Sequence, residues 1–169
     1  ILSGGGYAER VACPAGNALP IPSAVGLPAA GGVMEVYLTA TLNLLVLGEL
    51  QAGQRVLIHG GAGGVGTAAI QLARALGAEV WATASASKLD LCRTLGATRA
   101  IDYESEDFAG LLEEAGGAQL ILDCIGAKYL DRNLRALATD GTLVIIGLQG
   151  GVKAELDLLT VLSRRIRVQ

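Results

Sequence analysis

Charged residues are scarce in this sequence of 169 residues, and long apolar runs are missing. Only 17% of the side chains are charged, and 13 Lys and Arg against 16 Asp and Glu leave a net charge of −3. A hydrophobic fraction of 51% excludes a disordered chain, and the charge balance provides no basic surface for nucleic acid. Gly, Pro or charge interrupts each apolar run within roughly 18 residues, so we expect no membrane span.

Cysteines are too few and too scattered to form a framework. Cys13, Cys92 and Cys124 are odd in number and far apart in the chain, which indicates neither a disulfide scaffold nor a zinc knuckle. A reducing cytoplasm fits this usage best.

Residues 1–22 differ from the rest of the chain. A triple-glycine turn at 4–6 precedes a strand candidate at 7–13, and three prolines interrupt residues 14–22. We interpret this segment as the end of an all-β domain that lies upstream. The sequence begins without Met and ends inside an expected strand, so we expect a fragment of a longer protein.

The stretch that organises the remainder is a glycine cluster between an apolar run and a helical pattern. Gly61, Gly63 and Gly66 satisfy G-x-G-x-x-G directly after residues 56–59, and apolar residues then recur at spacings of three and four up to Gly77. In a strand–turn–helix setting, such glycines make a tight turn, let backbone approach a pyrophosphate and let the helix pack on the strand. The motif predicts a dinucleotide site.

Strands and helices alternate regularly over residues 23–169. We expect strands at 56–59, 79–83, 99–102, 119–123, 142–146 and 165–169. Helices are expected at 33–47, after the glycine cluster, and at 87–95, 105–115, 130–138 and 155–163, with a capping box at Ser87 and Asp90 opening one of them. Near-continuous apolar strands separated by helices indicate an α/β domain, a doubly wound parallel sheet of the Rossmann type.

The end of the second expected strand bears on the choice of dinucleotide. An NAD site places an acid there to bind the ribose 2′-hydroxyl, but the sequence from Thr83 to Lys88 holds none. Ser85, Ser87 and Lys88 can instead bind a 2′-phosphate, although, taken singly, Ser87 is more simply a cap and Lys88 a solvated side chain. This pattern favours NADP(H).

Several segments together resemble the medium-chain dehydrogenase/reductase superfamily. They are Tyr7-Ala8-Glu9, Tyr37-Leu38-Thr39-Ala40, Val56-Leu57-Ile58-His59 with the glycine loop, Ile101-Asp102-Tyr103 and Leu122-Asp123-Cys124-Ile125-Gly126. The resemblance extends over essentially the whole chain and is strongest to the zinc-free NADPH:quinone oxidoreductases of the zeta-crystallin and p53-inducible quinone reductase type. It implies that residues 1–22 end a GroES-like catalytic barrel and that residues 23–169 form an incomplete nucleotide-binding domain.

The resemblance also implies a set of cofactor contacts. Thr39 would lie near the nicotinamide, and Gly63, Gly64 and Val65 would hold the pyrophosphate. The remaining implied contacts are Ser85, Lys88 and Tyr103 around the 2′-phosphate, and Cys124, Ile125, Gly126, Gly147 and Leu148 beside the nicotinamide and its ribose.

No catalytic side chain and no metal ligand are assigned. Zinc-dependent alcohol dehydrogenases, the competing relatives, place a cysteine ligand four residues before the position of Thr39, where this chain has Glu35. Carboxylates also bind zinc, so Glu35 alone does not exclude it. The single histidine, His59, is conceivable as a base, but we interpret it as a packed residue beside the cofactor.

The expected function is hydride transfer from NADPH to a quinone or similar conjugated carbonyl. An enoyl or alkene reductase and a non-enzymatic NADPH-binding sensor or structural protein remain alternatives. A quinone takes protons from solvent, which agrees with the lack of an acid–base pair in the sequence. A strand over 166–169 would leave an exposed sheet edge, and relatives pair through the matching edge, so we expect a homodimer.

Overall fold

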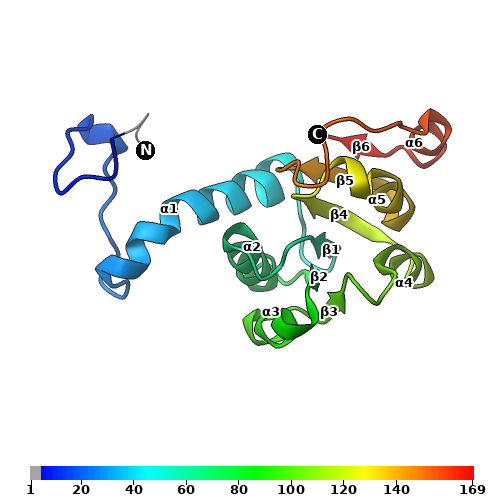
Figure 1. Ribbon diagram of the computed structural model, residues 1–169, viewed down its shortest axis with the longest axis horizontal. Helices are drawn as coiled ribbons and strands as arrows, with labels where there is room; N and C mark the ends of the chain where they lie inside the picture. The colour runs from blue at the N-terminus through cyan, green and yellow to red at the C-terminus, as the bar shows by residue number, and fades with distance from the viewer. Residues whose placement is uncertain (1–4) are drawn as a thin grey trace.

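Six parallel strands form one sheet in the order β3-β2-β1-β4-β5-β6. The computed structural model describes residues 5–169. The strands are β1 (Arg55–Ile58), β2 (Glu79–Ala84), β3 (Arg99–Asp102), β4 (Ala118–Asp123), β5 (Leu137–Ile145) and β6 (Arg167–Val168) (Figure 1). The chain leaves β1 toward one edge of the sheet and returns to β4 on the other side, so the strand order reverses between them. This is the doubly wound arrangement that the sequence predicts.

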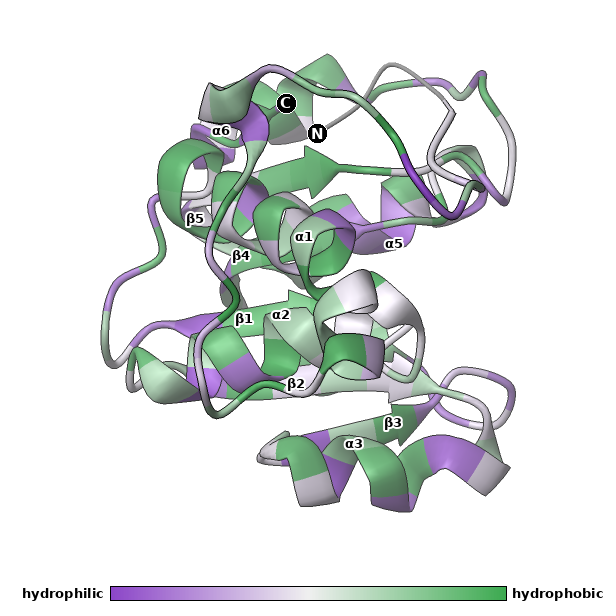
Figure 2. Cartoon of the chain, turned by 90° about the vertical axis from the view of Figure 1, so that its left-hand side faces the viewer, coloured by the Kyte–Doolittle hydropathy of each residue, from purple (hydrophilic) through white to green (hydrophobic). Residues whose placement is uncertain are grey.

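Helices cover both faces of the sheet. They are α1 (Leu27–Thr41), α2 (Gly64–Ala75), α3 (Leu89–Leu95), α4 (Phe108–Glu114), α5 (Leu130–Ala136) and α6 (Leu158–Arg164). Hydrophobic strands lie between helices that carry hydrophilic stretches on their outer sides (Figure 2). The pattern follows from burial, because the strands contact helices on both faces and the helices contact the sheet on one side only.

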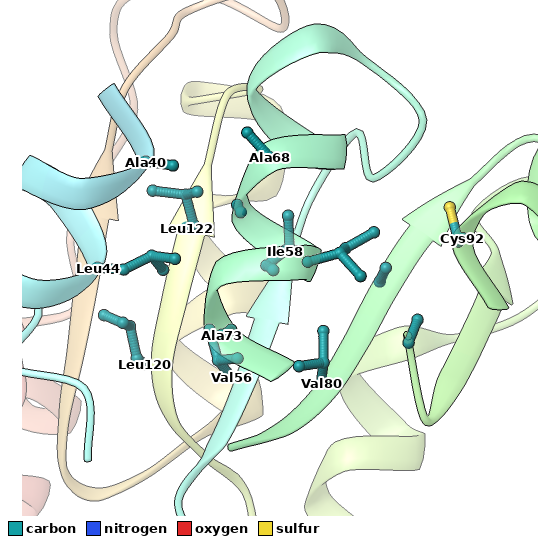
Figure 3. Close-up of a cluster of buried hydrophobic side chains, with 14 of the residues drawn as sticks. Ala40, Leu44, Val56, Ile58, Ala68, Ala73, Val80, Cys92, Leu120 and Leu122 are labelled. Atoms are coloured by element: carbon teal, nitrogen blue, oxygen red, sulfur yellow. The ribbon is translucent and has the colours of Figure 1, made fainter. Parts of the chain in front are cut away.

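Alternating strand residues divide the core into two clusters. Val56 and Ile58 point to the face covered by α1, α2 and α3, where Leu44 and Ala68 complete the packing (Figure 3). Leu57, between them in the sequence, belongs to a second cluster with residues of α4 and α5. The two-residue period of a strand produces this division.

Helix α1 is longer at its start than the sequence predicts. It begins at Leu27 instead of residue 33, because Pro28 is well tolerated in the first helical turn. A π-helical turn, Leu42–Leu47, continues it, and the Asn43 side-chain amide donates to the Thr39 carbonyl at 2.8 Å.

The continuous segment Leu27–Leu47 is long and apolar enough to cross a membrane by length and composition alone. The expectation that every apolar run is too short was therefore wrong for this segment. Ala40 and Leu44 are fully buried against the sheet and α2, so the C-terminal part of this segment packs on the domain, whereas only 17% of the segment is buried.

The strand expected at residues 7–13 is absent. These residues are exposed and non-helical, and a short 3-10 turn, Ala15–Asn17, follows them. A strand requires a neighbour to satisfy its backbone groups, and in the described part of the chain no strand pairs with this segment. Part of the expected glycine turn lies at residue 4, outside the described residues. The assignment of residues 1–22 to a catalytic barrel stays a prediction.

Three helix starts differ from expectation. The capping box at Ser87 does not form: residues Ala86–Lys88 make a 3-10 turn, and Asp90 pairs with Arg93 at 2.6 Å. Helices α4 and α6 each begin three residues later than expected, at Phe108 and Leu158, so that Asp107 and Asp157 lie at the N-cap positions. The Asp107 and Asp157 carboxylates each accept two backbone N–H groups there.

Strand β5 begins five residues before the expected strand. The sequence suggests a helix to residue 138 and a turn at Asp140, but the extended backbone starts at Leu137. The turn signal corresponds to a register irregularity within the strand, with Asp140 at φ 65°. Between the pairs Ala118–Leu137 and Leu120–Thr142, β5 has three residues more than β4, and such an insertion is accommodated by a bulge rather than by ending the strand.

Candidate nucleotide-binding site

A cleft of about 950 Å³ opens at the carboxyl edge of the sheet. Segments that follow β1, β3, β4 and β5 line it, which places it at the point where the strand order reverses. Open α/β sheets bind ligands at this position. The lining residues are His59, Gly60, Gly63, Gly64, Val65, Gly66, Thr83, Tyr103, Glu104, Leu122, Cys124, Ile125, Lys128, Tyr129, Arg132, Ile146, Gly147, Gln149 and Gly150.

The glycine loop after β1 forms one wall, and its backbone requires glycine at Gly60 and Gly66. Gly60 has a φ of 65°, and the Gly63 N–H donates to its carbonyl at 2.8 Å. A Cβ on Gly66 would collide with the Gly60 carbonyl oxygen, so no larger residue fits there. Gly63, by contrast, is exposed, and its Cβ would meet only that same oxygen at 3.2 Å.

The start of α2 presents backbone donors to the cleft. The first intrahelical hydrogen bond runs from Thr67 N–H to the Gly63 carbonyl, so the N–H groups of Gly64, Val65 and Gly66 have no partner within the helix. Free donors and the helix dipole attract anions. A glycine surface without side chains thus allows a pyrophosphate to approach the helix start, and the loop fits a dinucleotide.

Seven of the predicted cofactor residues line this cleft. They are Gly63, Gly64, Val65, Tyr103, Cys124, Ile125 and Gly147. The structure therefore brings together residues from four separate segments.

Two of the other predicted residues lie at the end of β2. Ser85 is half-buried and Lys88 is exposed, joined by a hydrogen bond from Lys88 N–H to the Ser85 carbonyl at 2.9 Å. The Tyr103 N–H donates to the Ala84 carbonyl at 3.3 Å, which brings the cleft residue Tyr103 beside this turn. All three therefore lie at the β2–β3 end of the site.

The remaining three, Thr39, Gly126 and Leu148, are not among the residues that line the cleft. Thr39 is half-buried on α1, one turn after Val36, and Val36 approaches the glycine loop closely enough to lie 3.1 Å from a Cβ on Gly64. Gly126 is buried with a φ of 79°, and a Cβ there would lie 2.9 Å from the exposed side chain of Leu148. Gly126 thus lets the segment after β5 lie against the segment after β4.

Sequence reasoning missed the cationic side of the cleft. Lys128 and Arg132 lie near the start of α5, and the Arg132 guanidinium lies 4.0 Å from the centre of the Phe108 ring. The Asp107 carboxylate holds Arg132 at 3.1 Å. The signal in the sequence was the pair Lys128 and Arg132, which are four residues apart and follow the end of β4.

A buried polar network lies beneath the cleft, and we define it as Thr83, His59, Asn133 and Asp123. His59 Nδ1 is 3.0 Å from the Thr83 hydroxyl, and Nε2 is 2.8 Å from Asn133 Oδ1. The Asn133 amide nitrogen donates to Asp123 at 3.1 Å. All four side chains are at most 3% exposed, so the network is a fixed part of the fold.

Burial of the ring lowers the pKa of His59 to about 4, against the hydrogen bond to Asn133, and nearby Arg132 lowers it further. His59 is therefore neutral at pH 7 and packed between Phe108 and Tyr129, with ring centres 4.8 and 4.9 Å away. His59 is packed, as the sequence predicts, and its place beside a cofactor stays a prediction.

Cys124 is half-buried in the cleft wall. Burial raises the pKa of its thiol, and the neighbouring Asp123 raises it further. A thiol with a raised pKa is a poor nucleophile at neutral pH, so Cys124 contributes shape to the cleft rather than reactivity.

Comparison with known proteins identifies the family. The zinc-binding dehydrogenase family matches residues 64–169. The chain belongs to this family. It is thereby a member of the medium-chain dehydrogenase/reductase superfamily, in the branch that resembles quinone reductases. Among the described residues there is no group of three or more His, Cys, Asp or Glu side chains placed to hold a metal ion.

Solved structures and curated relatives agree with this placement. A quinone oxidoreductase from Thermus thermophilus, also solved in complex with NADPH, is 36% identical with a TM-score of 0.90, covering 99% of this chain and 54% of that one. The CurK enoyl reductase is 31% identical with a TM-score of 0.76, covering 89% and 46%. The polyketide synthase protein NorB from Streptomyces orinoci is 43% identical over 76% of this chain.

The chain spans only part of each relative. It covers 6% of NorB and about half of the two reductases. The family membership and the fold are those of the nucleotide-binding part of a medium-chain reductase.

Proposed function

We propose that the cleft binds NADPH. The observation that carries this proposal is the glycine loop with free helical N–H groups, combined with a β2 end that lacks an acid. The loop suits the pyrophosphate, and Ser85, Lys88 and Tyr103 are placed to surround a 2′-phosphate. The NADPH complex of the Thermus enzyme supports the same choice.

The nicotinamide would lie at the other end of the cleft. Residues 124–126 and 147–148 form that end, and Thr39 on α1 would approach it from behind the glycine loop. NADPH, when bound, supplies the hydride. The side chains of this region are apolar or neutral, and their part is to orient the ring and to exclude water from the acceptor.

The proposed reaction is reduction of a quinone or a similar conjugated carbonyl. Among the titratable groups at the cleft, burial lowers the pKa of His59 and raises the pKa of Cys124 and Tyr129, so that these three are neutral at pH 7. A quinone needs no acid or base from the protein, because its reduced oxygens take protons from solvent. The proposal therefore requires no catalytic side chain and no zinc from this chain.

A second candidate is an enoyl or other activated-alkene reductase. The CurK enoyl reductase and the polyketide synthase relatives favour it. The same hydride donor and the same cleft serve both reactions, so the geometry of this domain supports them equally.

Turnover by the complete protein separates these candidates. NADPH oxidation is measured with 9,10-phenanthrenequinone and, separately, with an enoyl thioester. Faster oxidation with the quinone supports the first candidate, and faster oxidation with the thioester supports the second. Binding of NADPH without turnover of either compound would favour a sensor or structural role.

We also propose a homodimer formed through the free edge of the sheet. Strand β6 pairs only with β5 among the described residues, and three leucines of the adjoining α6, Leu158, Leu159 and Leu162, are about 70% exposed. An apolar surface beside an unpaired strand favours association. Sedimentation of the complete protein as a monomer at micromolar concentration would refute this assignment. A cytoplasmic location stays a prediction from the cysteine usage.

A further inference from the structure

We propose that Asn133 and His59 are positioning residues that hold the nicotinamide end of the cleft in shape through Asp123. Neither side chain needs to contact the reacting atoms for this role. The inference rests on the proposed NADPH site and adds to it the internal support that sets the position of residues 124–126.

Asp123 is the part of the network that touches the cleft wall. Its Oδ1 accepts the Ile125 N–H at 2.7 Å, and its Oδ2 accepts the Gly126 N–H at 3.0 Å. The carboxylate is fully buried, and the third donor to it is the Asn133 amide. Two successive backbone groups of the loop are thus fixed by one carboxylate.

The direction of each hydrogen bond follows from the Asp123 carboxyl group, whose two oxygens accept the Ile125 and Gly126 N–H groups. Asp123 only accepts, so the Asn133 nitrogen must face it and the Asn133 oxygen must face His59. Nε2 of His59 therefore carries the proton, and Nδ1 accepts from the Thr83 hydroxyl. One buried acid sets the amide orientation and the histidine tautomer, and it joins the carboxyl ends of β4, β1 and β2.

A shift of residues 124–126 would also move the segment after β5, because the two segments together form the nicotinamide end of the cleft. The Gly150 N–H donates to the Ile125 carbonyl at 2.6 Å, and the Ala127 N–H donates to the Gly151 carbonyl at 3.1 Å. The segment after β5 is therefore docked onto the segment that Asp123 fixes. The adenosine end has backbone bonds of its own, from Lys88 to Ser85 and from Tyr103 to Ala84, and only Thr83 of the network adjoins it.

The test compares two ligands that share only the adenosine end. We expect Asn133→Leu in the complete protein to weaken NADPH binding about tenfold, because one buried carboxylate and one imidazole lose a partner. Binding of 2′,5′-ADP, which has the 2′-phosphate but no nicotinamide, is expected to stay within about twofold. A purely structural role for Asn133 would change both affinities together.

Thr142→Val provides the matched control. Thr142 is also buried and polar, and its hydroxyl accepts from Arg167 at 3.1 Å, but it lies in β5 and not at the cleft. We expect this variant to bind both ligands as the unmodified protein does.

A second pair of variants covers the case in which Asn133→Leu does not fold. In His59→Gln the side-chain amide can still donate to Asn133, whereas in His59→Leu nothing does. The glutamine variant is expected to retain NADPH affinity within about threefold, and the leucine variant to lose about tenfold.

The outcomes are distinct. Equal loss of affinity for both ligands, or no loss for either, in Asn133→Leu overturns the positioning role while leaving the NADPH site intact. Equal NADPH affinity in the two His59 variants also overturns it. If the unmodified protein binds neither ligand, the proposed function itself fails and the positioning role fails with it.

Discussion

Acid should destabilise this domain through His59 in particular. The ring is buried and neutral, with a folded-state pKa of about 4 against 6.5 for a free histidine. The unfolded chain therefore binds a proton more readily than the folded chain between these two values. The stabilisation is complete above pH 6.5 and is lost as the pH falls to about 4. The difference between the folded-state and the free pKa of His59 corresponds to about 3 kcal/mol of unfolding free energy.

The perturbation that isolates this contribution is His59→Gln, which removes the titrating group but keeps a donor for Asn133. Urea unfolding of both proteins at several pH values gives the difference in their unfolding free energies. Carboxylates with altered pKa, such as Asp107 and Asp123, titrate in both proteins and cancel in that difference. We expect the advantage of the unmodified protein to shrink by about 3 kcal/mol between pH 7 and pH 4.

A difference that stays constant over this range would refute the reasoning. It would mean that His59 takes up its proton equally in the folded and unfolded states. The imidazole carbon resonance of His59 in an NMR titration gives an independent check, since it should stay at its neutral position down to about pH 4.

Three further predictions concern the cleft and its supports. Gly66→Ala should lower the unfolding free energy by several kcal/mol, because the new Cβ would collide with a backbone carbonyl oxygen in the glycine loop. Gly63→Ala should keep a normal melting temperature and bind NADPH more weakly. Equal stability of the two variants in calorimetry would contradict this. Lys88→Glu should weaken NADPH binding about tenfold and change NADH binding little, because the new carboxylate repels the 2′-phosphate. Isothermal titration with both nucleotides measures this. Equal losses of affinity for both would show that Lys88 does not contact the 2′-phosphate. Asp107→Ala should lower the unfolding free energy in urea by about 1 kcal/mol, because α4 loses its N-cap. The control Asp90→Ala removes only an exposed ion pair with Arg93 and should cost less than about 0.5 kcal/mol. Similar losses for the two variants would exclude the cap as the cause.

Local patterns account for what the sequence predicts well. The glycine loop, the alternation of strands and helices, and the end of α3 at Gly96 (φ 117°) each depend on a few neighbouring residues. His59 was also foreseen as a packed residue, because it follows a buried strand directly. The parallel order of the strands then follows from general rules of connection.

What could not be predicted depends on segments that meet only in the fold. Arg132 reaches the cleft because Phe108 and Asp107 from another helix support it. Asn133 joins His59 across 74 positions in sequence, and no periodicity marks such a pair. The strand expected at residues 7–13 was wrong for the opposite reason, since strand-like composition does not supply a partner strand.

The most direct test of the account is nucleotide binding by the complete protein, measured by isothermal titration with NADPH and NADH under the same conditions. The glycine loop and the acid-free end of β2 predict that NADPH binds tightly and that NADH binds at least about tenfold more weakly. Tighter binding of NADH, or no binding of either nucleotide, would contradict the central claim.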